Sequence, residues 1–147
     1  MNLRSLTEDD IPKVMRLYEK AIVPTWDGLG RDYDLPTIQR NMLSQIGKQN
    51  YHMIVATSGS SVTGYLAWEQ HPDHTSKHVI AHLRMILTTP SQQRVGLASG
   101  MMESFEQSAR VSGCTKVLFD VIVGSSALVF YDSRGYSHWS NYMEKVL

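Results

Sequence analysis

The chain has 147 residues, with 14 Lys and Arg against 14 Asp and Glu, so its formal net charge is zero. A balanced charge argues against a nucleic-acid-binding protein that works through a broad basic face. The length fits a single domain over residues 1–147 that is large enough to bury a hydrophobic core.

The first half of the chain alternates helical and strand-like periodicity. Apolar residues recur at helical spacing after Thr7, where Asp10 forms a weak capping box, and Pro36 suits the first turn of a second helix. The expected elements are a strand at 2–6, a helix to about 21, a loop at 24–34, a helix at 36–48, and a hairpin of strands 51–57 and 62–70 around the turn at 58–61.

The second half resembles a strand–helix–strand unit. The expected elements are a strand at 79–87, a helix at 97–111 that ends before Gly113, an apolar strand at 117–123, a helix at 125–134, and one or two strands in the tail 136–147. This order predicts an α/β protein with one mixed sheet and helices on both of its faces.

The stretch from Pro90 to Ala98 has the pattern of an anion-binding turn. It joins an apolar strand to a helix, and the free N–H groups of a first helical turn attract phosphate. Gly96 and Ala98 would let a pyrophosphate approach the backbone. The stretch matches neither a Walker loop nor a dinucleotide fingerprint. An ordinary helix start is the alternative interpretation.

Two motifs carry a family resemblance. Gln93, Gly96 and Ala98 fit the pattern Gln/Arg-x-x-Gly-x-Gly/Ala, and the segment 127–136 fits Ala-x-x-Phe/Leu-Tyr-x-x-x-Gly-Phe/Tyr. The chain therefore resembles the GNAT superfamily of acetyl-CoA-dependent N-acetyltransferases. It departs from the family at Gly124, where Asn is frequent, and at Thr88, where an aliphatic residue is usual.

The resemblance implies the GNAT fold over essentially the whole chain, with a central mixed sheet flanked by about four helices. It also implies acetyl-CoA as cosubstrate, with the pantetheine and pyrophosphate held mainly by backbone amides. The residues implied in this role are Ile86, Leu87, Thr88, Gln93, Arg94, Val95, Gly96, Leu97, Ala98 and Ser99.

His82 is the candidate general base, because a neutral imidazole can accept a proton from an amine at neutral pH. Strict alternation would place it on one strand face with Arg84, Ile86 and Thr88, opposite Ala81, Leu83, Met85 and Leu87. Arg84 should lower the pKa of His82 and either form a structural ion pair or bind a substrate carboxylate. The alternative for His82 is a structural role, paired with Glu69.

Tyr131 matches the position of the family's acid, which protonates the departing CoA thiolate; the alternative is an amphipathic core tyrosine. The acceptor amine would be bound by Trp26, Asp27, Tyr33, Glu69 and Arg84, in a mildly acidic and aromatic mouth. A solvated polar loop is the alternative there. His71, His74 and His78 form a group, but no Cys or close acidic partner supports a metal site, and none is predicted.

Three functions remain open. The first is an N-acetyltransferase for a small-molecule amine, working by direct transfer in a ternary complex because no convincing covalent nucleophile is visible. The second is a protein acetyltransferase acting on Lys or an N-terminus, and the third is a catalytically silent CoA-binding regulatory module. We expect a cytoplasmic protein, because Cys114 is the only cysteine and neither a signal peptide nor a membrane span is apparent. A homodimer is possible.

Overall fold

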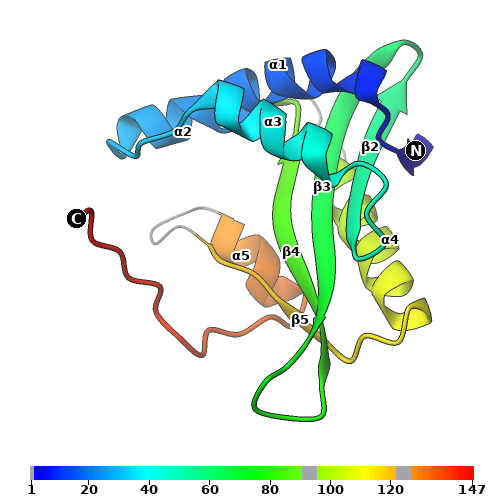
Figure 1. The fold of residues 1–147 in the computed structure, drawn as a ribbon, viewed down its shortest axis with the longest axis vertical. Helices are drawn as coiled ribbons and strands as arrows, with labels where there is room; N and C mark the ends of the chain where they lie inside the picture. The colour runs from blue at the N-terminus through cyan, green and yellow to red at the C-terminus, as the bar shows by residue number, and fades with distance from the viewer. Residues whose placement is uncertain (1, 91–95, 122–126) are drawn as a thin grey trace.

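One sheet of five strands organises the molecule, in the order β1-β2-β3-β4-β5 (Figure 1). The computed structural model describes residues 2–90, 96–121 and 127–147. β1 to β4 are antiparallel neighbours, and β5 runs parallel to β4, so the expected mixed sheet is confirmed. The strands are β1 (Asn2–Ser5), β2 (Tyr51–Ser58), β3 (Ser61–Pro72), β4 (Val79–Thr88) and β5 (Lys116–Leu118).

Helices cover both faces of this sheet. A 3-10 turn, η1 (Glu8–Asp10), leads into α1 (Ile11–Ala21), and α2 (Val23–Gly28) and α3 (Leu35–Gln45) follow on the same face. α4 (Leu97–Val111) lies against the opposite face, and the short α5 (Ala127–Ser133) comes after β5 (Figure 1). This arrangement of helices on both faces was expected from the element order.

The alternation of β3 divides the core in two. Tyr65 and Ala67 pack under α1 to α3, whereas Leu66 and Trp68 point to α4. The side chain of Phe105 is fully buried in the second cluster, with its ring 5.4 Å from that of Trp68. β3 therefore belongs to both cores, which explains why its centre is buried on both faces.

β4 departs from the alternation expected for it. Ala67 pairs with Met85 and the next residue, Trp68, pairs with Leu83, so Arg84 is the extra residue of a β-bulge. Beyond the bulge the faces exchange: Leu83 packs on the α4 side, whereas Met85 and Leu87 pack on the α1 side. The prediction of one continuous face was wrong because a single inserted residue shifts the period-2 pattern by one.

Three predicted segments have different limits in the structure. Residues 24–34 were expected to be a loop, but Pro24 takes a first-turn position of α2, and only the part after Gly28 is irregular. α3 ends at Gln45 and not at 48. The expected strand at 117–123 is paired only as far as Leu118; residues 119–121 are irregular, and the last two positions lie outside the described residues.

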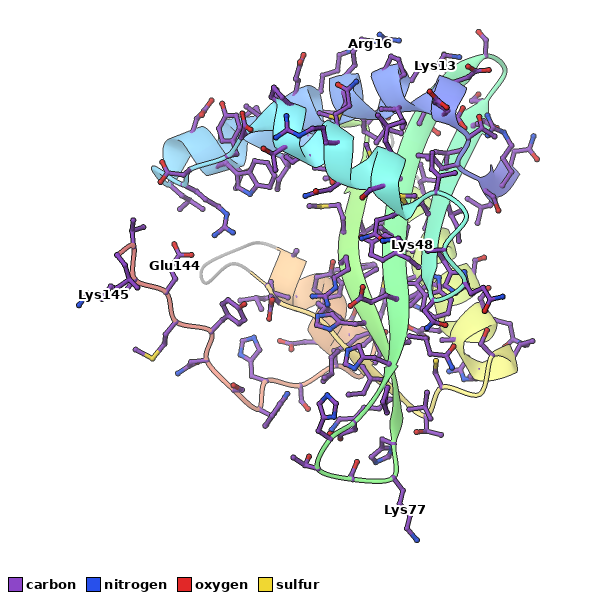
Figure 2. All side chains as sticks on the ribbon, in the orientation of Figure 1. Lys13, Arg16, Lys48, Lys77, Glu144 and Lys145 are labelled. Carbon is purple, nitrogen blue, oxygen red and sulfur yellow. The ribbon has the colours of Figure 1, made fainter. Side chains whose placement is uncertain are left out.

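The tail after α5 forms no strand, contrary to expectation. Trp139, Tyr142, Met143 and Val146 are spaced by three, one and three residues, which does not match the two-residue period of a strand, and all are exposed. Glu144 and Lys145 lie far from the sheet on this tail (Figure 2). Among the described residues, no helix is both long and apolar enough to span a membrane.

Candidate active site

β4 and β5 diverge, and their divergence opens a wedge at the edge of β4. The two parallel strands pair only over Ile80–Lys116, Ala81–Val117 and His82–Leu118. β4 continues to Thr88, and over its last part it pairs with β3 alone among the described residues. Because backbone groups of a strand alternate in direction, part of the β4 amides beyond His82 face this wedge. Ile86, Leu87 and Thr88, whose backbone groups are implied in cofactor binding, lie in this stretch of β4.

Gly96 begins α4 in the left-handed region, with φ +78° and ψ 13°. Within the described residues, a Cβ built at this position would meet nothing within 4 Å beyond its chain neighbours. α4 runs for 15 residues behind it, and Gly96, as its N-cap, has no side chain to accept from the first N–H groups. The N–H groups of a first helical turn have no partner within the helix and attract anions.

The other predicted cofactor residues fall into three groups. Gln93, Arg94 and Val95 lie outside the described residues, as does Gly124. Leu87, Thr88 and Leu97 have buried side chains and could contribute only backbone groups to a ligand, whereas Ile86, Ala98 and Ser99 are half-buried. The Ser99 hydroxyl accepts a hydrogen bond from Arg134 Nη1 at 3.1 Å.

His82 belongs to a cluster of four polar side chains on β3 and β4. Glu69 lies directly across the strands from His82, and its carboxylate forms an ion pair with Arg84. Arg84 Nη1 is 3.3 Å from His82 Nε2, and His71 Nε2 is 3.3 Å from His82 Nδ1. The expected alternative of an Arg84 ion pair is confirmed, while Glu69 pairs with Arg84 and not directly with His82.

The ends of this chain of contacts fix the ring tautomers. Arg84 has only N–H donors, so His82 Nε2 must accept and Nδ1 carries the proton. His71 Nδ1 donates to the Pro72 carbonyl at 3.1 Å, which leaves His71 Nε2 as the acceptor for His82. In this assignment His82 donates its Nδ1–H to His71 Nε2, and one hydrogen bond joins the two rings.

The surroundings of His82 disfavour its protonated form. Burial lowers its pKa most, and the positive charge of Arg84 and the neighbouring His71 lower it further, while Asp120 and Glu69 act in the opposite direction. The predicted effect of Arg84 has the right direction, but burial is the larger cause. His82 is unprotonated at neutral pH, as a proton acceptor must be.

Tyr131 lies on the β5 side of the wedge. Phe119 directly follows the last β5 residue paired with His82, and its ring centroid is 4.5 Å from that of Tyr131. Burial raises the pKa of Tyr131, so its hydroxyl is protonated at neutral pH. The hydroxyl forms no hydrogen bond within the described part of the chain, which leaves its proton available for donation.

Of the predicted acceptor residues, Glu69 and Arg84 belong to the cluster around His82, whereas Trp26, Asp27 and Tyr33 lie on α2 and the segment after it. Trp26 is buried on α2, between the rings of Tyr18 at 6.2 Å and Tyr33 at 5.6 Å. Tyr33 is partly exposed, and hydrogen bonding to Asp27 raises its pKa. Trp26 thus supports the fold, while Asp27 and Tyr33 present polar atoms to solvent.

Sequence reasoning missed His71 as a neighbour of His82. The strand was expected to end at 70, whereas β3 extends to Pro72 and carries His71 on the same face as Glu69. Pro72 pairs with Val79 on either side of the loop at 73–78. Counting residue pairs back from this loop places Glu69 opposite His82, with His71 two residues from Glu69 on the same strand face, and would have revealed the contact. Arg134, which contacts both Ser99 and Glu106, gave no comparable signal.

A family model described as "Acetyltransferase (GNAT) domain" matches residues 30–145, which is most of the chain. The protein belongs to the GNAT acetyltransferase family, and its mixed sheet with helices on both faces is the fold of that family. The resemblance noted from the two motifs is confirmed.

Solved structures agree on the fold. A transcriptional regulator from Bacillus halodurans C-125 has a TM-score of 0.83 at 18% identity, with 99% of each chain covered. The aminoglycoside antibiotic 6'-N-acetyltransferase from Acinetobacter haemolyticus has a TM-score of 0.80 at 16% identity, covering 100% of this chain and 99% of its own. An acetyltransferase from Trypanosoma brucei has a TM-score of 0.73 at 19% identity, with 99% of each covered. No curated protein matches the sequence.

Proposed function

We propose that this protein is an N-acetyltransferase that uses acetyl-CoA and acts on a primary amine of a small molecule. The observation that carries the proposal is the wedge at the edge of β4, which opens beside the Gly96 turn at the start of α4. The wedge offers backbone groups to an amide-bearing chain, and the turn offers N–H groups to a diphosphate. Membership of the acetyltransferase family supports the reaction type.

The described residues fit coenzyme A at this position. Among the described residues, no atom beyond its chain neighbours lies within 4 Å of a Cβ built at Gly96, and this N-cap residue has no side chain to occupy the first N–H groups of α4. The N–H groups of Leu97, Ala98 and Ser99 lie in the first turn, where an anion is favoured. Acetyl-CoA, when bound, supplies the acetyl thioester.

His82 supplies the base. An amine with a pKa near 10.4 must lose a proton before its lone pair can form the new C–N bond, and His82 Nε2 takes that proton. Nε2 is engaged by Arg84, whose side chain is 42% exposed and can move toward solvent when an amine approaches. His71 accepts the bond from Nδ1–H and thereby orients the ring and stabilises its charged form.

Tyr131 supplies the acid. Breaking the C–S bond leaves a thiolate, and the Tyr131 hydroxyl gives it a proton. The nitrogen loses its second proton as the amide forms, and that proton restores the Tyr131 hydroxyl. Tyr131 packs against the rings of Phe119, Phe130 and Tyr136, which hold it next to the end of β5. The raised pKa of Tyr131 keeps its hydroxyl protonated before transfer. It also makes the hydroxyl a weaker acid, so the thiolate must lie in good hydrogen-bond geometry to receive the proton.

The choice of a small amine rests on likeness. A protein with the same fold is an aminoglycoside antibiotic 6'-N-acetyltransferase. A Lys side chain or N-terminus of a protein is the second candidate acceptor. Acetylation of a peptide panel with no turnover of small amines would select it, and binding without any turnover would indicate a silent CoA module.

The first experiment measures thermal stabilisation by acetyl-CoA, with NAD and ATP as controls that share the adenine nucleotide. At a hundred times its Kd, a ligand stabilises the native state by about 2.7 kcal/mol, which is several degrees in Tm. We expect the shift with acetyl-CoA alone. No shift, or an equal one with all three, would remove the basis of the proposal.

The second experiment measures thiol release and acetylated product with panels of amines. We expect His82→Gln to lower kcat by about 10²–10⁴-fold while acetyl-CoA affinity is kept. Tyr131→Phe should slow transfer more than it weakens binding. Unchanged turnover in His82→Gln rejects the base, and a purely binding defect in Tyr131→Phe rejects the acid.

A further inference from the structure

Glu69, His71 and His82 bring three metal-ligand atoms into one small volume. One carboxylate oxygen and two ring nitrogens lie within 4.8 Å of one another, and all three residues are half-buried. Glu69 and His71 stand two residues apart on β3, and His82 is the cross-strand partner of Glu69. Because side chains two apart share a face of a strand, the sheet itself holds the three groups together.

We propose that these three side chains form a binding site for a first-row divalent ion of the Zn²⁺ class. Two imidazoles and one carboxylate are a donor set that suits zinc, and three protein ligands leave a coordination position open. This inference concerns binding and does not rest on the proposed acetyl transfer. With an ion on Nδ1 the proton of His82 sits on Nε2, so the metal-bound form could not use His82 as the base.

The separation of the two imidazoles supports the assignment. Two nitrogens bound to tetrahedral zinc at about 2.0–2.1 Å lie about 3.3–3.4 Å apart. His71 Nε2 and His82 Nδ1 are 3.3 Å apart, so an ion can bridge them without movement of the strands. They belong to residues on neighbouring strands, whose backbone pairing maintains that distance.

His71 is also oriented as a metal ligand. Its Nδ1–H donates to the Pro72 carbonyl at 3.1 Å, and the lone pair of Nε2 therefore points toward His82. A backbone carbonyl that fixes the second nitrogen is the usual outer contact of a zinc-bound histidine. At His82 the ring proton moves from Nδ1 to Nε2 when Nδ1 binds the ion, so the ring stays neutral.

Arg84 is the competitor for this site. Its guanidinium forms the ion pair with Glu69 and donates to His82 Nε2, and it must leave both before an ion binds. The Arg84 side chain is 42% exposed, so it can exchange these contacts for water at small cost. Removing its charge should therefore strengthen metal binding.

The test is calorimetric titration of the untagged chain with Zn²⁺, together with the visible absorption of bound Co²⁺. We expect one ion per chain with the intense Co²⁺ bands of a four- or five-coordinate site. His71→Ala and Glu69→Gln should each weaken binding at least about tenfold, while Arg84→Gln should tighten it.

His74→Ala and His78→Ala are matched controls, because these histidines lie nearby but outside the cluster. We expect both to bind as the unaltered chain does. The proposal is overturned if the unaltered chain takes up no ion, if His71→Ala binds equally well, or if either control removes binding. None of these measurements requires turnover, so their failure is separate from failure of the acetyltransferase proposal.

Discussion

Gly96 is a residue whose identity the backbone requires. Its φ of +78° is a conformation that costs other L-residues about 1–2 kcal/mol, while a Cβ there would meet no other atom within 4 Å. We expect Gly96→Ala to lower the free energy of unfolding by about that amount, and Gly96→Asn to lower it less, because Asn tolerates this region. Urea unfolding measures both. Equal stability of Gly96→Ala and the unaltered chain would mean that the turn has another conformation in solution.

Asp10 makes the stability of the fold sensitive to acid. The Arg4 guanidinium donates to both of its oxygens at 2.7 and 2.8 Å, Thr7 N–H donates at 2.8 Å, and these bonds hold the Asp10 pKa well below its usual range. Because the folded-state pKa lies below the unfolded value near 3.9, this stabilisation is present above about pH 4 and is lost as pH falls through and below it.

Asp10→Asn should therefore be less stable than the unaltered chain at pH 7 and lose less stability on acidification. Urea unfolding between pH 7 and pH 3 measures the difference between the two proteins. Asp9→Asn is the control, because Asp9 is the exposed neighbour of Asp10. If Asp10→Asn and Asp9→Asn respond alike to pH, the bonds to Arg4 and Thr7 do not contribute in the way described.

At the scale of elements, α4 is held to the sheet by a few buried side chains. Phe105 is fully buried against Trp68, while Val111 at the end of the same helix is 78% exposed. We expect Phe105→Ala to cost about 3–5 kcal/mol and Val111→Ala less than about 0.5 kcal/mol, measured by urea unfolding. Phe105→Leu provides a milder variant should the first not fold. A similar cost at both positions would show that α4 is not packed as described.

The helix α4 was predictable because its apolar residues recur every four positions and a glycine stands beyond each end. The bulge at Arg84 was not predictable. In the sequence, a polar residue at this position looks the same whether it is the extra residue of a bulge or a regular residue at a sheet edge. The site divides in the same way. His82 and Gly96 were found from local signals, whereas the contact with His71 depends on how far β3 extends, which is set by pairing with β4.

The whole molecule joins its two cores through β3, and the wedge lies where the sheet is least complete. β1 to β4 form a continuous antiparallel sheet, but β5 holds β4 through three residue pairs only. Backbone groups beyond His82 are thus paired on one side in the described structure, and α4 begins after the same strand with a glycine as its N-cap, which offers no side-chain acceptor. A single ligand in the wedge would complete the backbone pairing of β4 and also accept hydrogen bonds from the N–H groups at the start of α4.

Hydrogen–deuterium exchange tests this joint role. With acetyl-CoA at a hundred times its Kd, amides of 83–88 and 97–100 that exchange by local opening should slow by up to about a hundredfold. Amides of β1 should change little, because β1 is the opposite edge strand of the sheet, and ATP serves as the control ligand. If exchange slows only at 97–100, the ligand binds as an anion at the start of α4 and does not pair with β4. Slowing in both segments together would tie the opened strand and the Gly96 turn to a single ligand, because no small anion reaches from one to the other.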